Sequence, residues 1–174
     1  LRLAALRKVM SAHTYQDRLA YVASKVRGEP LGSLMPKVLV LAYARSQDQL
    51  STLAQAFERQ TYSERRMIIV VPNGLCKEGM AHREGISLIE ADTASELTIG
   101  EVAGGATLVS GFVSEDYYGP EYLRDLALTD RYSRASAFGK AEIFACEPSG
   151  AVKLPASDKT FRPVKELAMR SSMV

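Results

Sequence analysis

The sequence has few of the residues that usually indicate a metal site or a disulfide framework. Of its 174 residues, two are histidine, two are cysteine and none is tryptophan. His13 and His82 stand apart from other candidate ligands, and Cys76 and Cys146 have no zinc-binding spacing. We therefore expect structural or surface histidines and reduced cysteines, which is typical of an intracellular protein.

Long apolar runs and a charge excess are missing as well. No stretch approaches the ~20 apolar residues that are needed to span a bilayer. The first residues do not follow the basic, apolar and small-residue order of a signal peptide. The 22 basic and 20 acidic residues give a formal net charge of +2, which is too balanced to indicate nucleic acid as a partner. We expect a cytoplasmic protein.

The N-terminal part of the chain has the pattern of a basic helix. Thr14 before Asp17 can cap the start of a helix, and Gly28 can close its end. Apolar residues recur there at helical spacing, namely Tyr15, Leu19, Val22 and Val26. The basic residues of this part are Arg2, Arg7, Lys8, Arg18, Lys25 and Arg27. We expect residues 1–27 to be helical, with either a solvated basic face or a face that contacts an anionic membrane surface or an acidic partner.

The rest of the chain is predicted to be one domain behind a linker. Residues 28–36, "GEPLGSLMP", are rich in glycine and proline and indicate a linker. The 47% of hydrophobic residues is enough for a compact domain with a core. The main domain is therefore expected to span residues 37–174.

Two apolar runs open this domain and indicate its fold class. "KVLVLAY", Lys37–Tyr43, and "MIIVVPNG", Met67–Gly74, are typical of strands covered on both faces. Ser46 and Gln49, between them, have the spacing of a capping box at the start of a helix. Strand, helix and strand predict a right-handed βαβ unit, so the expected fold class is α/β with a mainly parallel sheet flanked by helices.

An acidic pair follows the last predicted strand of this sheet. "GISLIEA", Gly85–Ala91, and "ATLVSGFV", Ala106–Val113, are predicted strands, with a weaker helix over Ala94–Ala103 between them. Pro120 suits the first turn of a further helix, with Glu121 at its positive end. Between that strand and that helix lie the two acids, Glu115 and Asp116. Ligands of open α/β sheets bind beyond the carboxyl ends of the strands, so this is the position of a site.

Several segments resemble family 2 glycosyltransferases in their order and spacing. Residues 36–74, "PKVLVLAYARSQDQLSTLAQAFERQTYSERRMIIVVPNG", resemble the opening of that family. "SEDYYGPEYLRDL", residues 114–126, resembles the run of aspartates before Tyr-Tyr-Gly-Pro-x-Tyr-Leu in many bacterial polysaccharide glycosyltransferases. "SAFGKAEIF", Ser136–Phe144, and "LAMRSSMV", Leu167–Val174, are similar to their next two strands. The resemblance covers Pro36 to Val174.

The resemblance implies a GT-A fold, which is a Rossmann-like sheet that binds a nucleotide-sugar at the strand ends. The implied activity is transfer of the sugar to a polysaccharide or glycoconjugate acceptor. The implied donor-binding residues are Tyr43, Arg45, Asn73 and Glu115. Mn²⁺ or Mg²⁺, held by Asp116 with Glu115, would stabilise the charge on the leaving diphosphate.

The chain also departs from the family pattern. Val113 and Ser114 stand where the family has aspartates, and Glu115 replaces another aspartate. The first strand ends in Ala-Tyr-Ala-Arg without two polar residues of the family, and Pro72 and Asn73 occupy the place of an acid that reads the base. The segment that carries the family's base is expected beyond Val174, so no catalytic base is identified.

Each candidate residue therefore keeps a structural alternative. The acids can serve the helix dipole instead of a metal. Arg45 can be a surface residue, and Asn73 can provide a left-handed turn position. Tyr117 and Tyr118 can pack and cap instead of stacking on a sugar. Two functions remain open: a metal-assisted glycosyltransferase domain, or a catalytically degenerate GT-A-like module that serves as a binding or assembly element of a larger protein.

Overall fold

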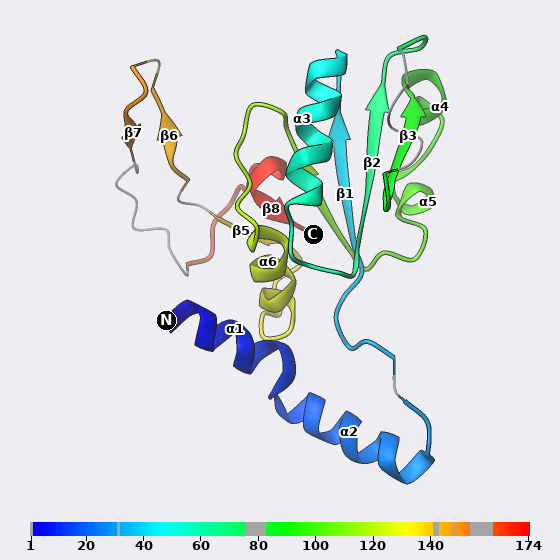
Figure 1. Cartoon of the computed structure of the whole chain (residues 1–174), viewed down its shortest axis with the longest axis vertical. Coiled ribbons are helices and arrows are strands. Elements are labelled where there is room, and N and C mark those ends of the chain that lie inside the picture. The colour runs from blue at the N-terminus through cyan, green and yellow to red at the C-terminus, as the bar shows by residue number, and fades with distance from the viewer. Residues whose placement is uncertain (1, 31, 76–82, 141–142, 148, 154–161) are drawn as a thin grey trace.

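A computed structural model describes residues 2–30, 32–75, 83–140, 143–147, 149–153 and 162–174. The predictions for Cys76 and His82 lie outside these residues. The chain has an α/β fold around a six-stranded sheet of order β3-β2-β1-β4-β8-β5 (Figure 1). The strands of this sheet are β1 (Val38–Tyr43), β2 (Arg65–Val71), β3 (Ile86–Glu90), β4 (Leu108–Phe112), β5 (Phe138–Gly139) and β8 (Ser172–Met173).

The first four strands are parallel, as the sequence predicts. From β1 the chain runs outward to β2 and β3, and then returns so that β4 pairs with the other side of β1. Val40 of β1 accordingly lies between Met67 of β2 and Ser110 of β4. β8 is antiparallel to both β4 and β5. The mostly parallel sheet with its helices is compatible with a Rossmann-like fold.

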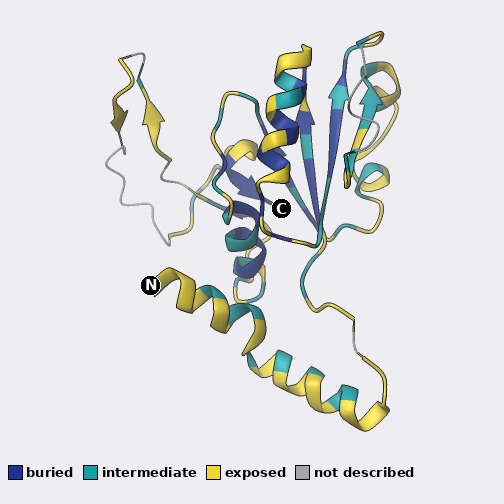
Figure 2. Cartoon of the chain, viewed as in Figure 1, coloured by how far each residue is buried: buried dark blue, intermediate teal, exposed yellow. Residues whose placement is uncertain are grey.

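The core lies at the centre of this sheet. Successive residues of β1, from Val38 to Val40, are all buried, which is expected for a strand covered on both faces. Helix α3 (Gln47–Glu58) buries Leu50, Leu53, Ala54 and Phe57 at helical spacing along one face. Figure 2 shows the dark blue of buried residues concentrated on the central strands and on the helix sides that face them.

Two predicted helices differ from the observed ones. The segment Ala94–Ala103 forms two short helices, α4 (Ala91–Ser95) and α5 (Ile99–Ala103), because Thr98 starts the second one with a capping box to Glu101. The helix expected to include Pro120 is α6 (Tyr122–Asp130), which begins after it. The Pro120 carbonyl instead accepts a hydrogen bond from the Thr61 N–H at 2.8 Å, which ties this turn to the end of α3.

The last two segments form less strand than the resemblance implies. Of Ser136–Phe144, only Phe138–Gly139 joins the sheet, and residues 141–142 lie outside the described part. Within Leu167–Val174, only β8 is a strand, and a short 3-10 helix (Met169–Ser171) precedes it. A separate hairpin of β6 (Ala145–Cys146) and β7 (Val152–Lys153) stands apart from the sheet in Figure 1.

The N-terminal part forms two helices, α1 (Arg2–Ala12) and α2 (Tyr15–Arg27). The predicted capping box of Thr14 with Asp17 is present, and Gly28 ends α2 in the left-handed conformation with a φ of 72°. Figure 1 shows both helices beyond the end of the sheet at which β1 and β2 begin. In the part of the chain that the structure describes, no helix is long and apolar enough to cross a membrane.

Candidate functional site

A pocket of about 460 Å³ lies at the carboxyl ends of β1 and β4. These two neighbouring strands mark the point at which the strand order reverses, because the chain leaves β1 toward β2 and later returns to pair β4 on its other side. In open α/β sheets, that crevice is the usual ligand site. The pocket is lined by Leu41, Ala42, Tyr43, Arg45, Gln49, Gly111, Phe112, Val113, Ser114, Glu115, Met169 and Arg170.

Glu115 contributes an anionic group to this pocket. Its carboxylate accepts hydrogen bonds from Ser114 Oγ at 2.8 Å and from Gln49 Nε2 at 3.2 Å. The hydrogen bond from Ser114 lowers the pKa of Glu115 below its ordinary value, and the Arg45 charge acts in the same direction. Glu115 is therefore ionised at neutral pH.

Gln49 connects the two walls of the pocket, which the sequence did not predict. Ser46 Oγ accepts the Gln49 N–H at 3.3 Å, so the first half of the expected capping box is present. The side chain of Gln49, however, accepts the backbone N–H of Arg45 at 2.8 Å and donates to Glu115. The capping spacing was the signal in the sequence, because it places Gln49 just after the first strand. It predicts, however, that the Gln49 amide accepts the Ser46 N–H, and the observed partners are Arg45 and Glu115.

Arg170 is a second site residue that sequence reasoning missed. It lies in the short 3-10 helix before β8, and its Nη1 is 3.5 Å from Asp116 Oδ1. The two residues are 54 positions apart in sequence. Asp116 is not among the residues that line the pocket, so the acidic pair diverges: Glu115 faces Gln49, and Asp116 faces Arg170.

A cluster of three aromatic rings supports the acidic turn. The Phe112 and Tyr118 rings stack with centroids 3.8 Å apart, and Tyr122 meets both edge-on. The Tyr118 hydroxyl accepts the Val113 N–H at 3.1 Å and donates to the Arg170 carbonyl at 3.2 Å. Burial raises the pKa of Tyr118 to about 12, so it stays neutral. Tyr118 is thus a packing residue, as one of the two alternatives predicted.

The remaining candidates separate into two groups. Tyr43 and Arg45 both line the pocket, with the Arg45 guanidinium 5.8 Å from the centroid of the half-exposed Tyr43 ring. Asn73, after β2, donates to the Asp92 carboxylate at the start of α4 and does not line the pocket. The structure therefore brings together Tyr43, Arg45 and Glu115, and places Asn73 with Asp92.

The acids can be tested against the metal that the resemblance implies. Among the described residues there is no group of three or more His, Cys, Asp or Glu side chains that could hold a metal ion. Mg²⁺, however, is commonly bound by one or two carboxylates while phosphates and water supply the other ligands. Glu115, which is ionised and lines the pocket, could be one carboxylate of such a site, whereas Asp116 would first have to leave its contact with Arg170.

Comparisons with known proteins do not assign the chain to a family. No model of a known protein family matches the sequence, and a search of curated proteins finds no match. The fold and the pocket themselves define an α/β domain, compatible with a Rossmann-like fold, with a crevice lined by both apolar and charged residues where its strand order reverses.

Proposed function

We propose that this chain is a GT-A-like domain of the family 2 glycosyltransferase type that binds a nucleotide-sugar in the pocket between β1 and β4. The observation that carries the proposal is the position of this pocket, because it coincides with the strand-order reversal and is lined by residues that the resemblance marks as donor-binding. The full reaction would transfer the sugar to a polysaccharide or glycoconjugate acceptor.

Charge and shape of the lining residues suit a nucleoside diphosphate. Arg45 and Arg170 line the pocket from the β1 and β8 sides, and guanidinium groups bind phosphate oxygens well. Tyr43, which is 47% exposed, offers the face of its ring to a base or a sugar. The Glu115 carboxylate can accept hydrogen bonds from ribose or sugar hydroxyls. Asn73 remains a predicted contact to the base edge.

A divalent metal remains part of the proposal. Asp116 and Glu115 would hold Mn²⁺ or Mg²⁺, which would offset the negative charge of the diphosphate as it leaves. The chain's own contribution is to keep Glu115 ionised and to place two guanidinium groups beside the phosphates. No residue is assigned as the base that accepts the acceptor's proton, so we expect binding without turnover from these 174 residues.

Titration calorimetry tests donor binding directly. UDP-, GDP- and CDP-sugars are titrated into the native chain with and without Mn²⁺. Arg45→Ala should weaken binding of the preferred donor about tenfold or more, because one charged hydrogen bond to phosphate is lost. Arg134→Ala is the matched control, since Arg134 is exposed and lies outside the pocket. Absence of binding by the native chain, or equal loss in both variants, would reject the proposal.

The alternative of a degenerate GT-A-like module has an observation in its favour. Both acids already have partners within the chain, Glu115 with Ser114 and Gln49, and Asp116 with Arg170. A site whose charges satisfy one another needs no metal to be stable. The module would then serve as a binding or assembly element, and no nucleotide-sugar would bind with or without Mn²⁺.

A further inference from the structure

The helices α1 and α2 expose an unusual amount of apolar surface. None of their described residues is buried, and Figure 2 shows both helices mostly yellow. The large apolar side chains that are more than half exposed are Leu3, Leu6, Val9, Tyr15, Leu19, Tyr21, Val22 and Val26. Large apolar side chains that are exposed together on neighbouring helices can mark an interaction site.

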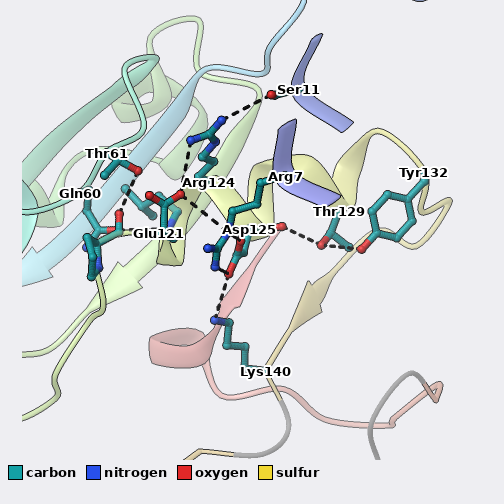
Figure 3. Close-up of polar contacts among 12 residues, drawn as sticks. Arg7, Ser11, Gln60, Thr61, Glu121, Arg124, Asp125, Thr129, Tyr132 and Lys140 are labelled. Atoms are coloured by element: carbon teal, nitrogen blue, oxygen red, sulfur yellow. Dashed lines mark hydrogen bonds and ion pairs between the residues drawn. The ribbon is translucent and has the colours of Figure 1, made fainter. Parts of the chain in front are cut away.

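The two helices attach to the domain through polar contacts. Arg7 of α1 makes a bidentate contact with Asp125 of α6, at 2.6 Å and 3.0 Å (Figure 3). Arg131, just after α6, binds the Asp17 carboxylate of α2 at 2.8 Å and the Met10 carbonyl at 2.8 Å. The Arg131 side chain is only 5% exposed, so this contact is fixed in the interface. The polar side of the helices thus faces the domain.

Helix geometry then directs the apolar side of α2 into solvent. Successive residues are rotated by about 100° around a helix, so residues two and five positions after Asp17 lie on the opposite side from it. Those residues are Leu19 and Val22, which are 67% and 56% exposed. Ala20 and Ser24, on the same side as Asp17, are only partly exposed. The side of α2 that carries Asp17 is therefore partly covered, whereas its large apolar side is exposed.

Positive charges border this apolar side. In the described part of the chain, the ion pairs of α1 and α2 involve only Arg7 and Asp17. Arg18 and Lys25 flank the Leu19 and Val22 stripe on one edge, and Arg27 lies toward the other. Among the described residues, no carboxylate pairs with Arg2, Lys8, Arg18, Lys25 or Arg27. An apolar stripe between cations is complementary to a bilayer whose headgroups are anionic.

We propose that the exposed faces of α1 and α2 dock the protein on an anionic phospholipid surface. The apolar side chains enter the interfacial region, and the bordering cations meet lipid phosphates and carboxylates. The helices lie beyond the end of the sheet where β1 begins, whereas the pocket lies at the other end of β1 (Figure 1). Docking would leave the pocket open. This inference does not depend on nucleotide binding.

Vesicle co-sedimentation of the full chain tests the proposal. We expect binding to phosphatidylcholine vesicles that contain about 30% phosphatidylserine, and binding weaker by about tenfold or more to vesicles of phosphatidylcholine alone. The double variants Leu19→Ser with Val22→Ser, and Arg18→Gln with Lys25→Gln, should each weaken binding to the anionic vesicles about tenfold or more. All four side chains are exposed, so the variants are expected to keep the native thermal unfolding curve.

Matched changes elsewhere provide the control. Ile99→Ser with Val152→Ser removes exposed apolar side chains, and Arg134→Gln with Lys165→Gln removes exposed charges, in both cases outside the two helices. These variants should bind as the native chain does. Failure of the native chain to bind anionic vesicles, or an equal loss in the controls, would overturn the proposal. A native dimer that Leu19→Ser with Val22→Ser converts to a monomer, with unchanged vesicle binding, would assign the face to a second copy instead.

Discussion

At the scale of single residues, the two adjacent acids Glu115 and Asp116 have different contacts and surroundings. Glu115 faces the pocket and is bound to Gln49 of α3, whereas Asp116 turns toward Arg170 ahead of β8. The Glu115 carboxylate is therefore held by a residue of α3, and the Asp116 carboxylate by a residue that precedes β8. A ligand or metal that uses both must first compete with these internal partners.

Substituting the two acids separately should distinguish their roles. If the proposed metal site exists, Asp116→Asn should weaken Mn²⁺-dependent nucleotide binding by about tenfold or more, because a site with few carboxylates would lose an anionic oxygen ligand. Glu115→Gln should have a smaller effect, since the longer side chain can reach the metal through water or contact the ribose. Calorimetry with and without Mn²⁺ measures both. Asp130→Asn, which makes the same change at the C-terminal end of α6 and away from the acidic turn, should bind like the native chain. Loss of binding that is equal in the presence and absence of Mn²⁺ would exclude the metal role.

Part of this site could be predicted from the sequence. Tyr43, Arg45 and Glu115 lie at or just after the ends of apolar runs that are recognisably strands, and the carboxyl ends of parallel strands meet at one edge. Arg170 could not be placed, because its position depends on how β8 inserts between β4 and β5 across a long stretch of chain. The orientation of the Gln49 amide also depends on a carboxylate from a distant strand.

At the scale of elements, β8 is the piece that completes the site. It lies antiparallel between β4 and β5, and Ser110 Oγ of β4 donates to the Ser172 carbonyl at 2.9 Å. Arg170 immediately precedes this strand. Any change that separates β8 from its neighbours should therefore also displace the guanidinium beside Asp116.

Gly139 of β5 provides a way to separate these strands. A Cβ at this position would lie 2.5 Å from the Ser171 carbonyl oxygen and 2.9 Å from Ser172 Cα, both of which are backbone atoms. Gly139→Ala should lower the free energy of unfolding by about 1–3 kcal/mol, because the strands must move apart. Gly100→Ala is the control, since its nearest atom would be 3.9 Å away. Urea unfolding of both variants measures the difference; an unchanged midpoint for Gly139→Ala would contradict the close approach of β5 and β8.

The attachment of α2 depends largely on Arg131. Burial alone would raise the pKa of Asp17, but the hydrogen bonds from Arg131 and Thr14 outweigh it and lower that pKa. Arg131→Ala removes the partner of this partly buried carboxylate. We expect the amides of α2 to exchange about tenfold faster or more, while those of β1 and β2 keep their rates. Arg134→Ala, three residues further on, is expected to have no effect.

Hydrogen exchange on the same samples also tests the predicted linker. Residues 28–30 and 32–36, which carry no helix or strand, should exchange rapidly in the native protein. Slow exchange there, or unchanged α2 rates in Arg131→Ala, would mean that other contacts hold the N-terminal helices.

At the scale of the whole molecule, buried tyrosines set an upper pH limit for stability. Burial raises the pKa of Tyr62, Tyr118 and Tyr122, in the case of Tyr118 to about 12. In the unfolded chain these groups titrate near their ordinary pKa of ~10. Because the folded state retains protons that the unfolded state loses, the stabilisation is complete below pH ~10 and is lost as the pH rises toward the folded values.

The free energy of unfolding should therefore be flat up to pH ~10 and fall steeply above it. Urea unfolding across this range measures the decline. In Tyr118→Phe the decline should be shallower, because one of the three groups can no longer ionise. Tyr117→Phe is the control, since Tyr117 is 78% exposed and has no buried hydroxyl to protect. An identical decline in both variants would contradict the burial argument.

The fold class could be predicted from the sequence, whereas the arrangement of the N-terminal helices could not. Apolar runs of the length of β1 and β2 leave few alternatives to buried parallel strands. The pattern of Tyr15, Leu19, Val22 and Val26 predicted a helix, but not that its apolar side would remain exposed. That outcome depends on Arg131. Its ion pair with Asp17 turns the Asp17 side of α2 toward the domain, and the apolar side of the helix then points away from it.

The reversal of strand order at β1 has a consequence for how the protein folds. β1 and β2 belong to one βαβ unit, whereas β1 and β4 are joined across a separation of 70 residues, and β4 and β8 across one of 62. Closing long loops costs more entropy and slows folding, so the β1–α3–β2 unit should form first and the pocket walls should meet late. In stopped-flow refolding, helical signal should precede competence to bind the proposed nucleotide-sugar. A ligand in the pocket would then stabilise the β1–β4 contacts, which form last during folding.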